Sequence, residues 1–466
     1  MSDLTPSRAT ADPHHDGDPH HDGDPAKARA AVRAGVLAYF VDQFDIYLPI
    51  VVLAPATAYF QSTALDPGTS AILTALVFAS TLIARPLGAA VFGHFADTTG
   101  RKKTTLVAVA GFGVTTLLIA CLPGYATIGL WSVGLLIALR FVDGFFLGGE
   151  YTTAVPLAME WSQRHRRGLV SGVITCTSPG AYALIAAITL LLLQIIPAGG
   201  PDSAYAQWGW RIPFVVGALL AAVLYRQYRR EVEEPPTERT AKGARPPLGQ
   251  LLTGRHRGAL LQVFVLMSGV WLANNMTSAV LPGLLASQLH LSSTQVSVIM
   301  LVAMATVSAT FPLHGLLSQR VGRRGFYIGF GIAMVVVGAG AYAVLTTTRP
   351  SFGVALVLSV IIGVATLGAF GPIAAYLTER FPSAIRASGY GVGYSLALIV
   401  PAFYAFYLSG LAAILPAALG PVVLVVLAGL LVTAGALAGP ETRDVDMRDD
   451  EHRAAAPNPA APEAIR

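Results

Sequence analysis

The chain has 466 residues, of which 54% are hydrophobic and only 12% charged. Soluble domains carry about 25% charged residues, so this composition excludes an ordinary soluble enzyme or binding module and indicates a membrane protein. The formal net charge of +5 reflects basic residues confined to short turns; no base-reading module is present, so nucleic acid is not an expected partner.

The first 32 residues are predicted to form a disordered cytoplasmic tail. They repeat His-His-Asp-Gly-Asp-Pro at His14–Pro19 and His20–Pro25. A His-rich tract can bind metal, but nothing here would hold the ligands in a fixed geometry. We therefore favour a soluble tail and expect neither a metal site nor a cofactor. This start also lacks the apolar core of a signal peptide.

Twelve apolar runs follow, each long enough to cross about 30 Å of hydrocarbon. They are 33–60, 70–95, 104–123, 130–158, 168–196, 211–229, 258–287, 294–318, 325–346, 351–378, 385–409 and 412–438. Pro49 and Pro55 are expected to kink the first run, and Gly410 marks a plausible turn near the end of the eleventh.

The chain therefore reads as an all-α membrane protein with twelve transmembrane helices in two six-helix pseudo-repeats. The expected parts are an N-terminal bundle at 33–229, a cytoplasmic linker at 230–257, a C-terminal bundle at 258–438 and a disordered tail at 439–466.

Two sequence signals recur at nearly one offset. The segment Gly93–Lys103 returns in diluted form at Gly315–Arg324, 222 residues later. Glu160 and Arg167, seven residues apart, are echoed by Glu379 and Arg386 at an offset of 219. This agreement indicates a duplicated unit. Transporters built from parallel repeats hold their substrate between the halves, near the middle of the bilayer.

The distribution of basic residues predicts orientation. If the N-terminus is cytoplasmic, then of 31 Lys and Arg only Arg211 and Arg349 fall at outside loops. Cytoplasmic loops carry such an excess of basic residues. We expect a monomeric, multi-pass protein of the cell (plasma or inner) membrane, surrounded by the lipid bilayer, with both termini cytoplasmic.

Charged residues inside spans are rare and cost roughly 2.5–3.5 kcal/mol at the bilayer centre on insertion scales. Asp42 and Asp45 lie in the first span; Arg140, Asp143 and Glu150 form one stripe along the fourth. Arg140 and Asp143 could simply neutralise each other, which would leave Asp45 and Glu150 unexplained. We favour Arg140 paired with Asp45, or with Asp42 as second choice. An aspartate beside a guanidinium stays ionised until the pair separates, which would make a proton-coupling switch.

Several polar residues are candidates for a substrate cavity. Asn274 and Asn275 are adjacent amides in the seventh span, which could bind a polar ligand or bond neighbouring helices. Glu150 and Asp143 are further candidates, because they could receive the cationic end of a zwitterion. The aromatic candidates are Tyr47, Tyr394 and Trp271.

Gating residues are expected at the turns between spans: Gly93, Asp97, Gly100, Arg101, Glu160, Arg167, Glu379 and Arg386. Glu160 is expected to pair with Arg167, and Glu379 with Arg386. Such pairs would hold an outward-open state and break as the halves rock inward. Gln319 stands in the second copy where the first has Asp97, so the second copy should hold less tightly.

Several motifs in chain order resemble the major facilitator superfamily and, within it, the metabolite:proton symporters. They are Arg85-Pro86-Leu87-Gly88, Gly93–Lys103, Arg140 to Gly148-Gly149-Glu150, Glu160 to Arg167-Gly168, Trp208–Phe214 and Glu379 to Arg386.

Within this resemblance, Asp42-Gln43-Phe44-Asp45 is also similar to the Asp-x-x-Asp of aromatic-acid and sialate symporters, and Asp143 stands where glutamine is usual. In related sugar:proton symporters an aspartate of the first helix and an arginine of the fourth form the coupling pair, and by motif position these resemble Asp45 and Arg140.

The sequence thus predicts proton-coupled uptake of a small polar metabolite, an organic acid or zwitterion, by alternating access. The alternative is a proton-coupled drug or metabolite exporter, for which Ser178-Pro179-Gly180 gives only part of the expected helix motif. An enzyme is not expected, because the chain has no His-Glu-x-x-His, no Gly-x-Ser-x-Gly and no P-loop.

Overall fold

A computed structural model describes residues 25–62, 64–65, 67–197, 199–232, 247–254, 256–348 and 350–447. Within these ranges the secondary structure is helical without a strand, and twelve helices are long and apolar enough to cross a membrane. The predicted fold class and number of spans are therefore confirmed. The histidines of the N-terminal repeats lie outside the described residues, as does most of the linker.

Six spans come from the N-terminal half. Its helices are α1 (Pro25–Val51), α2 (Thr57–Phe60), α3 (Pro67–Thr99), α4 (Arg101–Ala120), α5 (Tyr125–Ile128), α6 (Trp131–Glu160), α7 (Arg167–Thr175), α8 (Thr177–Ile195) and α9 (Arg211–Glu231). The fifth span is interrupted at Cys176, between α7 and α8. Pro179 follows in the first turn of α8, where its missing N–H is tolerated.

The C-terminal half supplies the other six spans. Its helices are α10 (Pro247–Leu252), α11 (Arg257–Asn275), α12 (Leu281–Ser287), α13 (Ser293–Val321), α14 (Arg323–Ala333), α15 (Ala339–Thr348), α16 (Phe352–Leu367), α17 (Ile373–Arg380), α18 (Arg386–Leu396), α19 (Ile399–Ala402), α20 (Tyr404–Ala412) and α21 (Gly420–Leu437). A π-helical turn, Met276–Val280, joins α11 to α12. Such turns are frequent at functional sites.

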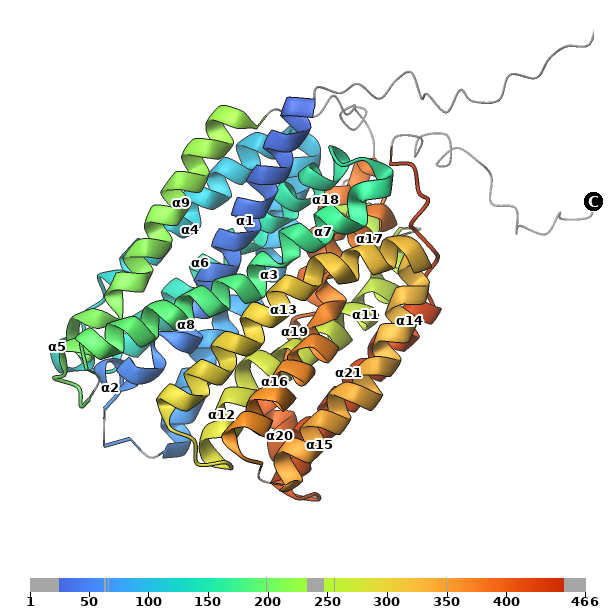
Figure 1. Cartoon of the computed structure of the whole chain (residues 1–466). Helices are drawn as coiled ribbons and strands as arrows, with labels where there is room; N and C mark the ends of the chain where they lie inside the picture. The colour runs from blue at the N-terminus through green and yellow to red at the C-terminus, as the bar shows by residue number, and fades with distance from the viewer. Residues whose placement is uncertain are drawn as a thin grey trace, which may run out of the picture.

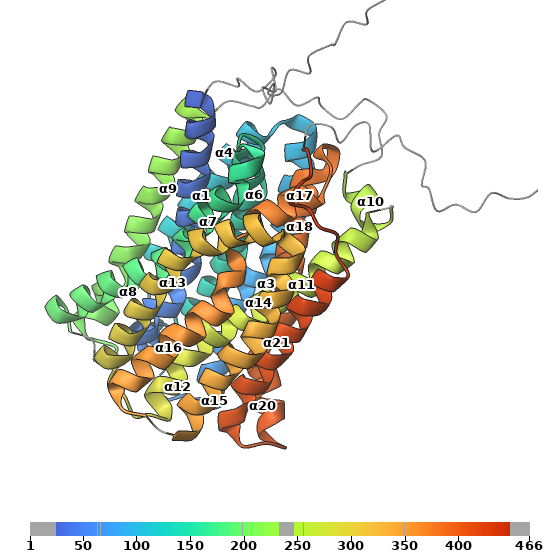
Figure 2. The ribbon, with the colours of Figure 1, turned by 45° about the vertical axis from the view of Figure 1, so that its right-hand side comes forward.

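The two halves lie side by side, blue to green beside yellow to red (Figure 1). The start of α1, the end of α9 and the turn between α17 and α18 lie at one end of the bundle (Figure 2). We call this the basic end, because its turns carry Arg101, Lys102, Lys103, Arg164, Arg166, Arg323 and Arg324. Apolar side chains such as Leu191 and Val336 are exposed on the outside of the bundle, where lipid would cover them.

Several boundaries differ from the predicted ones. Helix α1 begins at Pro25, inside the segment expected to be a tail, and ends at Val51, so that Pro49 lies in its last turn. Gly410 lies inside α20, and the turn comes after Ala412. Residues 439–447 are not helical, but they contact the basic end as described below. Proline and glycine signals located these turns only to within a few residues, because tertiary packing decides where a helix stops.

Candidate functional site: buried charges beside a pocket between the halves

Asp45 and Arg140 form a buried ion pair between α1 and α6. Arg140 donates from Nη1 to Asp45 Oδ2 at 2.8 Å, and Thr116 of α4 donates to Oδ1 at 2.7 Å. Pro49 has no N–H to bond the carbonyl four residues before it. That carbonyl belongs to Asp45, and it lies 3.5 Å from Arg140 Nη2. The proline therefore leaves a backbone acceptor that contributes to the same site.

Arg140 also lies beside a second carboxylate. Asp143 Oδ2 is 3.0 Å from the same Nη1 atom, and Thr116 bridges to Asp143 Oδ1 at 3.5 Å. The two interpretations of Arg140 are thus both realised, because one guanidinium faces both Asp45 and Asp143. Two carboxylates share one cation, so this group has one negative charge more than positive when both acids are ionised.

Asp42 makes a different pair from the one considered as second choice. Its two carboxylate oxygens lie 3.0 and 3.1 Å from Arg85 Nη2 of α3, and Gln43 donates to it at 2.7 Å. The ring of Tyr151 lies over the guanidinium, with its centroid 4.6 Å from Arg85 Cζ. Asp42 is therefore the partner of Arg85 and not of Arg140.

The two ion pairs belong to one group of four acids and two arginines, which we call the charge cluster. Each of its residues is at most 2% exposed: Asp42, Asp45, Arg85, Arg140, Asp143 and Glu150. Both carboxylate oxygens of Glu150 are buried and accept no hydrogen bond. A buried charge without a partner costs several kcal/mol, so such a cluster favours binding of protons or a compensating ligand.

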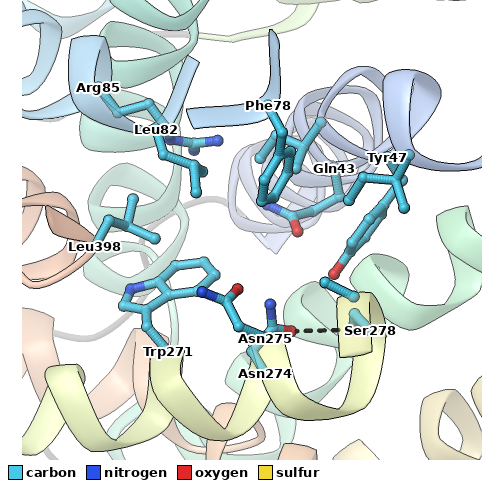
Figure 3. A pocket seen from close by; sticks show the side chains of 13 residues that line it. Gln43, Tyr47, Phe78, Leu82, Arg85, Trp271, Asn274, Asn275, Ser278 and Leu398 are labelled. Carbon is cyan, nitrogen blue, oxygen red and sulfur yellow. Dashed lines mark hydrogen bonds between the residues drawn. The ribbon is translucent and has the colours of Figure 1, made fainter. Parts of the chain in front are cut away.

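A pocket lies next to the charge cluster, between the halves. It is lined by Gln43, Ile46, Tyr47, Ile50, Phe78, Leu82 and Arg85 from the N-terminal half, and by Trp271, Asn274, Asn275, Ser278, Ala279 and Leu398 from the C-terminal half. Figure 3 shows Arg85 and Leu82 on one side, Gln43 and Tyr47 on another, and Trp271 with the two asparagines below them.

The pocket brings together only some of the predicted substrate residues. Tyr47, Asn274 and Asn275 line it, as does Trp271, whereas Asp143, Glu150 and Tyr394 are fully buried outside its lining. Arg85 lines it and was not a predicted site residue. A basic residue inside an apolar span was the signal that could have indicated Arg85 as a site residue. In the sequence it was interpreted only as part of a family motif.

The adjacent asparagines combine the two uses considered for them. Asn275 donates to the carbonyl of Pro401 at 2.9 Å, which joins α11 to α19. The side-chain oxygen of Asn274 lies 3.5 Å from the hydroxyl of Ser278 in the π-helical turn. Both amides also line the pocket, so Asn275 is held in place while Asn274 has donors left for a ligand.

An aromatic layer separates the pocket from the basic end. The hydroxyls of Tyr39 and Tyr394 lie 2.8 Å apart and connect α1 to α18. Trp271 donates to the Tyr394 carbonyl at 3.0 Å, and the rings of Tyr151 and Tyr394 lie 4.9 Å apart. These side chains connect both halves directly behind the pocket wall.

The ion pairs at the basic end differ from the predicted ones. Glu160 accepts from Arg101 of its own half and from Arg386 of the other half, the latter at 2.9 Å. Glu379 pairs with Arg323 at 3.1 Å. The expected Glu160–Arg167 and Glu379–Arg386 pairs are wrong. A seven-residue spacing matches two turns only within one helix, and here α6 ends at Glu160 before α7 begins at Arg167.

The repeated motif places an oxygen acceptor at the interface in both copies. Asp97 accepts from the backbone N–H groups of Ala387 and Ser388, at 3.2 and 3.0 Å, and from the Ser388 hydroxyl at 2.7 Å. Gln319, its counterpart, accepts from the Gly168 N–H at 3.1 Å. A carboxylate is also favoured at a helix N-terminus, so the first copy makes the stronger contact.

Glycines at the basic end have two roles: two of them form turns, and two others allow the halves to meet closely. Gly100 and Gly322 occupy equivalent turns with φ of 113° and 89°, which side chains with a Cβ rarely adopt. A Cβ on Gly93 would lie 3.0 Å from Ser388 Cα. A Cβ on Gly315 would overlap the carbonyl oxygen of Gly168.

The segment 439–447, which we call the C-terminal strap, crosses the basic end. Glu441 accepts from the N–H groups of Arg323 and Arg324 at the start of α14, at 2.8 and 3.1 Å. Arg167 of the N-terminal half donates to the carbonyl of Val445 at 2.8 Å.

An exposed ion pair also links the strap to the N-terminal half. Arg164 lies 3.0 Å from Asp444. Hydrogen bonding from Arg443, with a smaller effect of Arg164, holds the pKa of Asp444 below its ordinary value.

Comparison with known proteins agrees with this architecture. The family model described as Major Facilitator Superfamily matches residues 35–273 and 263–464. The inner membrane metabolite transport protein YhjE of Escherichia coli K12 is 31% identical over 388 residues, covering 81% of this chain and 86% of that protein. The alpha-ketoglutarate permease of Escherichia coli K12 is 31% identical, covering 77% and 81%.

A proline/betaine transporter of Salmonella typhimurium LT2 is 28% identical, covering 80% of this chain and 76% of the transporter. Among solved structures, the proton:xylose symporter XylE bound to 6-bromo-6-deoxy-D-glucose has a TM-score of 0.73 at 16% identity, covering 92% of this chain and 99% of that one. The protein belongs to the major facilitator superfamily. It is a membrane transporter with the twelve-helix fold of that family, and resembles its metabolite symporters.

Proposed function

We propose that the protein takes up a small polar metabolite, an organic acid or a zwitterion, together with protons by alternating access. The observation that carries this proposal is the charge cluster, in which Asp45 and Asp143 face one guanidinium, that of Arg140, next to a pocket between the halves. Buried acids that outnumber their cations can take up and release protons as their pairing changes. Two relatives of the chain, an alpha-ketoglutarate permease and a proline/betaine transporter, support a solute of this class.

We place the basic end in the cytoplasm, because basic turns remain on that side of membranes. Glu160, Asp97 and Gln319 then join the halves on the cytoplasmic side of the pocket. This arrangement keeps the pocket away from the cytoplasm and corresponds to an outward-facing or occluded state. Inward opening requires these contacts to break. Asp45 would take up a proton when it separates from Arg140 and release it when the pair forms again.

The direct test is electrogenic uptake in proteoliposomes. Purified protein is reconstituted and given 2-oxoglutarate, L-proline or glycine betaine between about pH 5.5 and 8, a range that brackets a perturbed carboxyl group. We expect solute accumulation driven by an inward proton gradient, with a larger current at acid pH. Liposomes with the Asp45→Asn variant are the matched control.

Proton movement opposite to the solute would instead favour proton-coupled export. The interruption at Cys176 between α7 and α8, next to Ser178-Pro179-Gly180, is the feature that makes export the second candidate. The sign of the proton flux in the same preparation separates the two directions.

A further inference from the structure

Arg85 is the charged residue that reaches the pocket wall from the charge cluster. It lines the pocket together with Gln43 and Tyr47, and Figure 3 shows its guanidinium on the side of the pocket across from Tyr47. The other arginine of the cluster, Arg140, is not among the lining residues. Any solute in the pocket therefore meets a cationic group at Arg85.

The bonding of Arg85 is incomplete. Its Nη2 atom serves both oxygens of Asp42, while Nε and Nη1 are buried and have no hydrogen-bond partner. Leaving a buried donor unsatisfied costs about 1–3 kcal/mol, and more for a charged group. Native proteins rarely tolerate this without a functional reason.

The orientation of this guanidinium is fixed from two directions. Asp42 holds it from α1, and the Tyr151 ring lies over its face at 4.6 Å. Arg85 therefore presents its remaining donors without having to be ordered by the ligand. Such preorganisation reduces the entropic cost of binding.

We propose that Arg85 binds the carboxylate of the transported solute through its free N–H groups. The solute class is then a small carboxylic acid or zwitterion. The remainder of the solute lies against Trp271, with Asn274 available for a polar group. This inference rests on the proposed transport function and specifies which residue recognises the solute. It also predicts that a solute lacking a carboxylate is rejected, because the donors of Arg85 would remain unpaired.

Glu150 is the competing partner for these donors inside the protein. Its two carboxylate oxygens are buried and unpaired, so a rearrangement that brought it to Arg85 would satisfy both groups. In that case Arg85 would have a structural role. Glu150→Gln and Arg85→Lys would then change the binding affinity by the same factor for every ligand. A carboxylate-binding role predicts instead that the effect of Arg85→Lys depends on whether the ligand carries a carboxylate.

The experiment measures equilibrium binding to purified full-length protein in detergent, without a proton gradient. The probes are 2-oxoglutarate, L-proline and glycine betaine, each paired with a counterpart that lacks the carboxylate: dimethyl 2-oxoglutarate, L-prolinamide and choline. Wild type is compared with Arg85→Lys, with the charge-neutral double variant Arg85→Gln/Asp42→Asn, with Glu150→Gln, and with the exposed-site control Asp202→Asn. Thermal melting in the absence of probe reports whether each variant folds.

We expect at least one carboxylate to bind wild type, and its counterpart to bind about tenfold more weakly or worse. Arg85→Lys and the double variant should weaken binding of the carboxylate by a similar factor. In Arg85→Lys the ammonium lacks the planar donors of arginine, and in the double variant the cation is absent. Asp202→Asn should leave binding unchanged.

Three results would overturn the assignment: no probe with a carboxylate binds, counterparts bind as well as carboxylates, or Arg85→Lys binds like wild type. Carboxylate-specific binding without proton-driven accumulation would instead reject proton coupling and leave the role of Arg85 intact.

Discussion

The hydroxyls of Tyr39 and Tyr394 lie 2.8 Å apart although the residues are 355 positions apart and belong to different halves. Both tyrosines are at most 1% exposed. Their bond lies behind the pocket wall, where Trp271 also bonds Tyr394. The pocket residue Trp271 and the contact between the halves therefore belong to one buried aromatic layer.

Replacing Tyr394 by Phe should favour opening of the basic end. The lost hydrogen bond contributes about 1 kcal/mol, which corresponds to roughly a fivefold change in the ratio of closed to open states. Distances between spin labels placed on the two halves at the basic end would measure that ratio. Tyr407→Phe is the matched control, because Tyr407 bonds Val400 within its own half; an equal effect of both variants would contradict the assigned role.

Replacing Asp45 by Asn should abolish gradient-driven accumulation while some downhill exchange remains. An amide can still accept from Thr116, but it cannot carry a proton. Counterflow and proton-driven uptake measured in the same liposomes separate the two activities. Normal accumulation by this variant would move the proton site to another acid of the charge cluster, with Asp143 first because it shares Arg140.

The variants Glu160→Gln and Glu379→Gln should have different effects, the first on the conformational ratio and the second on stability. Glu160 bonds an arginine of each half, whereas Glu379 bonds Arg323 and the strap residue Thr442 within the C-terminal half. Breaking a buried pair costs about 3–5 kcal/mol. We expect Glu379→Gln to lower the melting temperature with an unchanged conformational ratio, and Glu160→Gln to populate the inward-open state. Similar spin-label distances in both variants would argue against the bridging role of Glu160.

Replacing Gly315 by Ala should hinder closure of the basic end. The added Cβ overlaps the Gly168 carbonyl oxygen, and overpacking of this kind costs about 1–3 kcal/mol. Turnover should fall, and spin-label distances across the basic end should lengthen. Gly325→Ala is the control, since a Cβ there meets no atom within 4 Å.

Asp444→Asn should not alter the pH dependence of transport. The pKa of Asp444 is lowered, chiefly by hydrogen bonding to Arg443. Its stabilising contribution is therefore present above the ordinary carboxyl pKa and is lost only as pH falls through the lowered value, below the range of about 5.5 to 8 used for transport. An altered profile in this variant would mean that strap contacts, and not the charge cluster, set the acid response.

The sequence was sufficient for the number of spans, the duplication and the pairing of Arg140 with an acid of the first helix, because hydropathy and repeated motifs depend on local residues. It was insufficient where a side chain faces a neighbour from the other repeat. Glu160 and Arg386 are 226 residues apart, and no spacing within one copy indicates their contact.

The same limit applied to the pocket. Asn274 and Asp143 were both plausible lining residues, but only the rotation of each helix in the assembled bundle decides which one borders the cavity. Asn274 does, and Asp143 is turned toward Arg140.

The C-terminal strap has a practical consequence for any work with this protein. Glu441 accepts the first backbone N–H groups of α14, and Val445 accepts Arg167 from the opposite half. A truncation that ends at the last residue of α21 would remove both acceptors and leave Arg167 without that bond. Affinity tags or fluorescent fusions should therefore be attached beyond Met447, so that the contacts of the strap are kept.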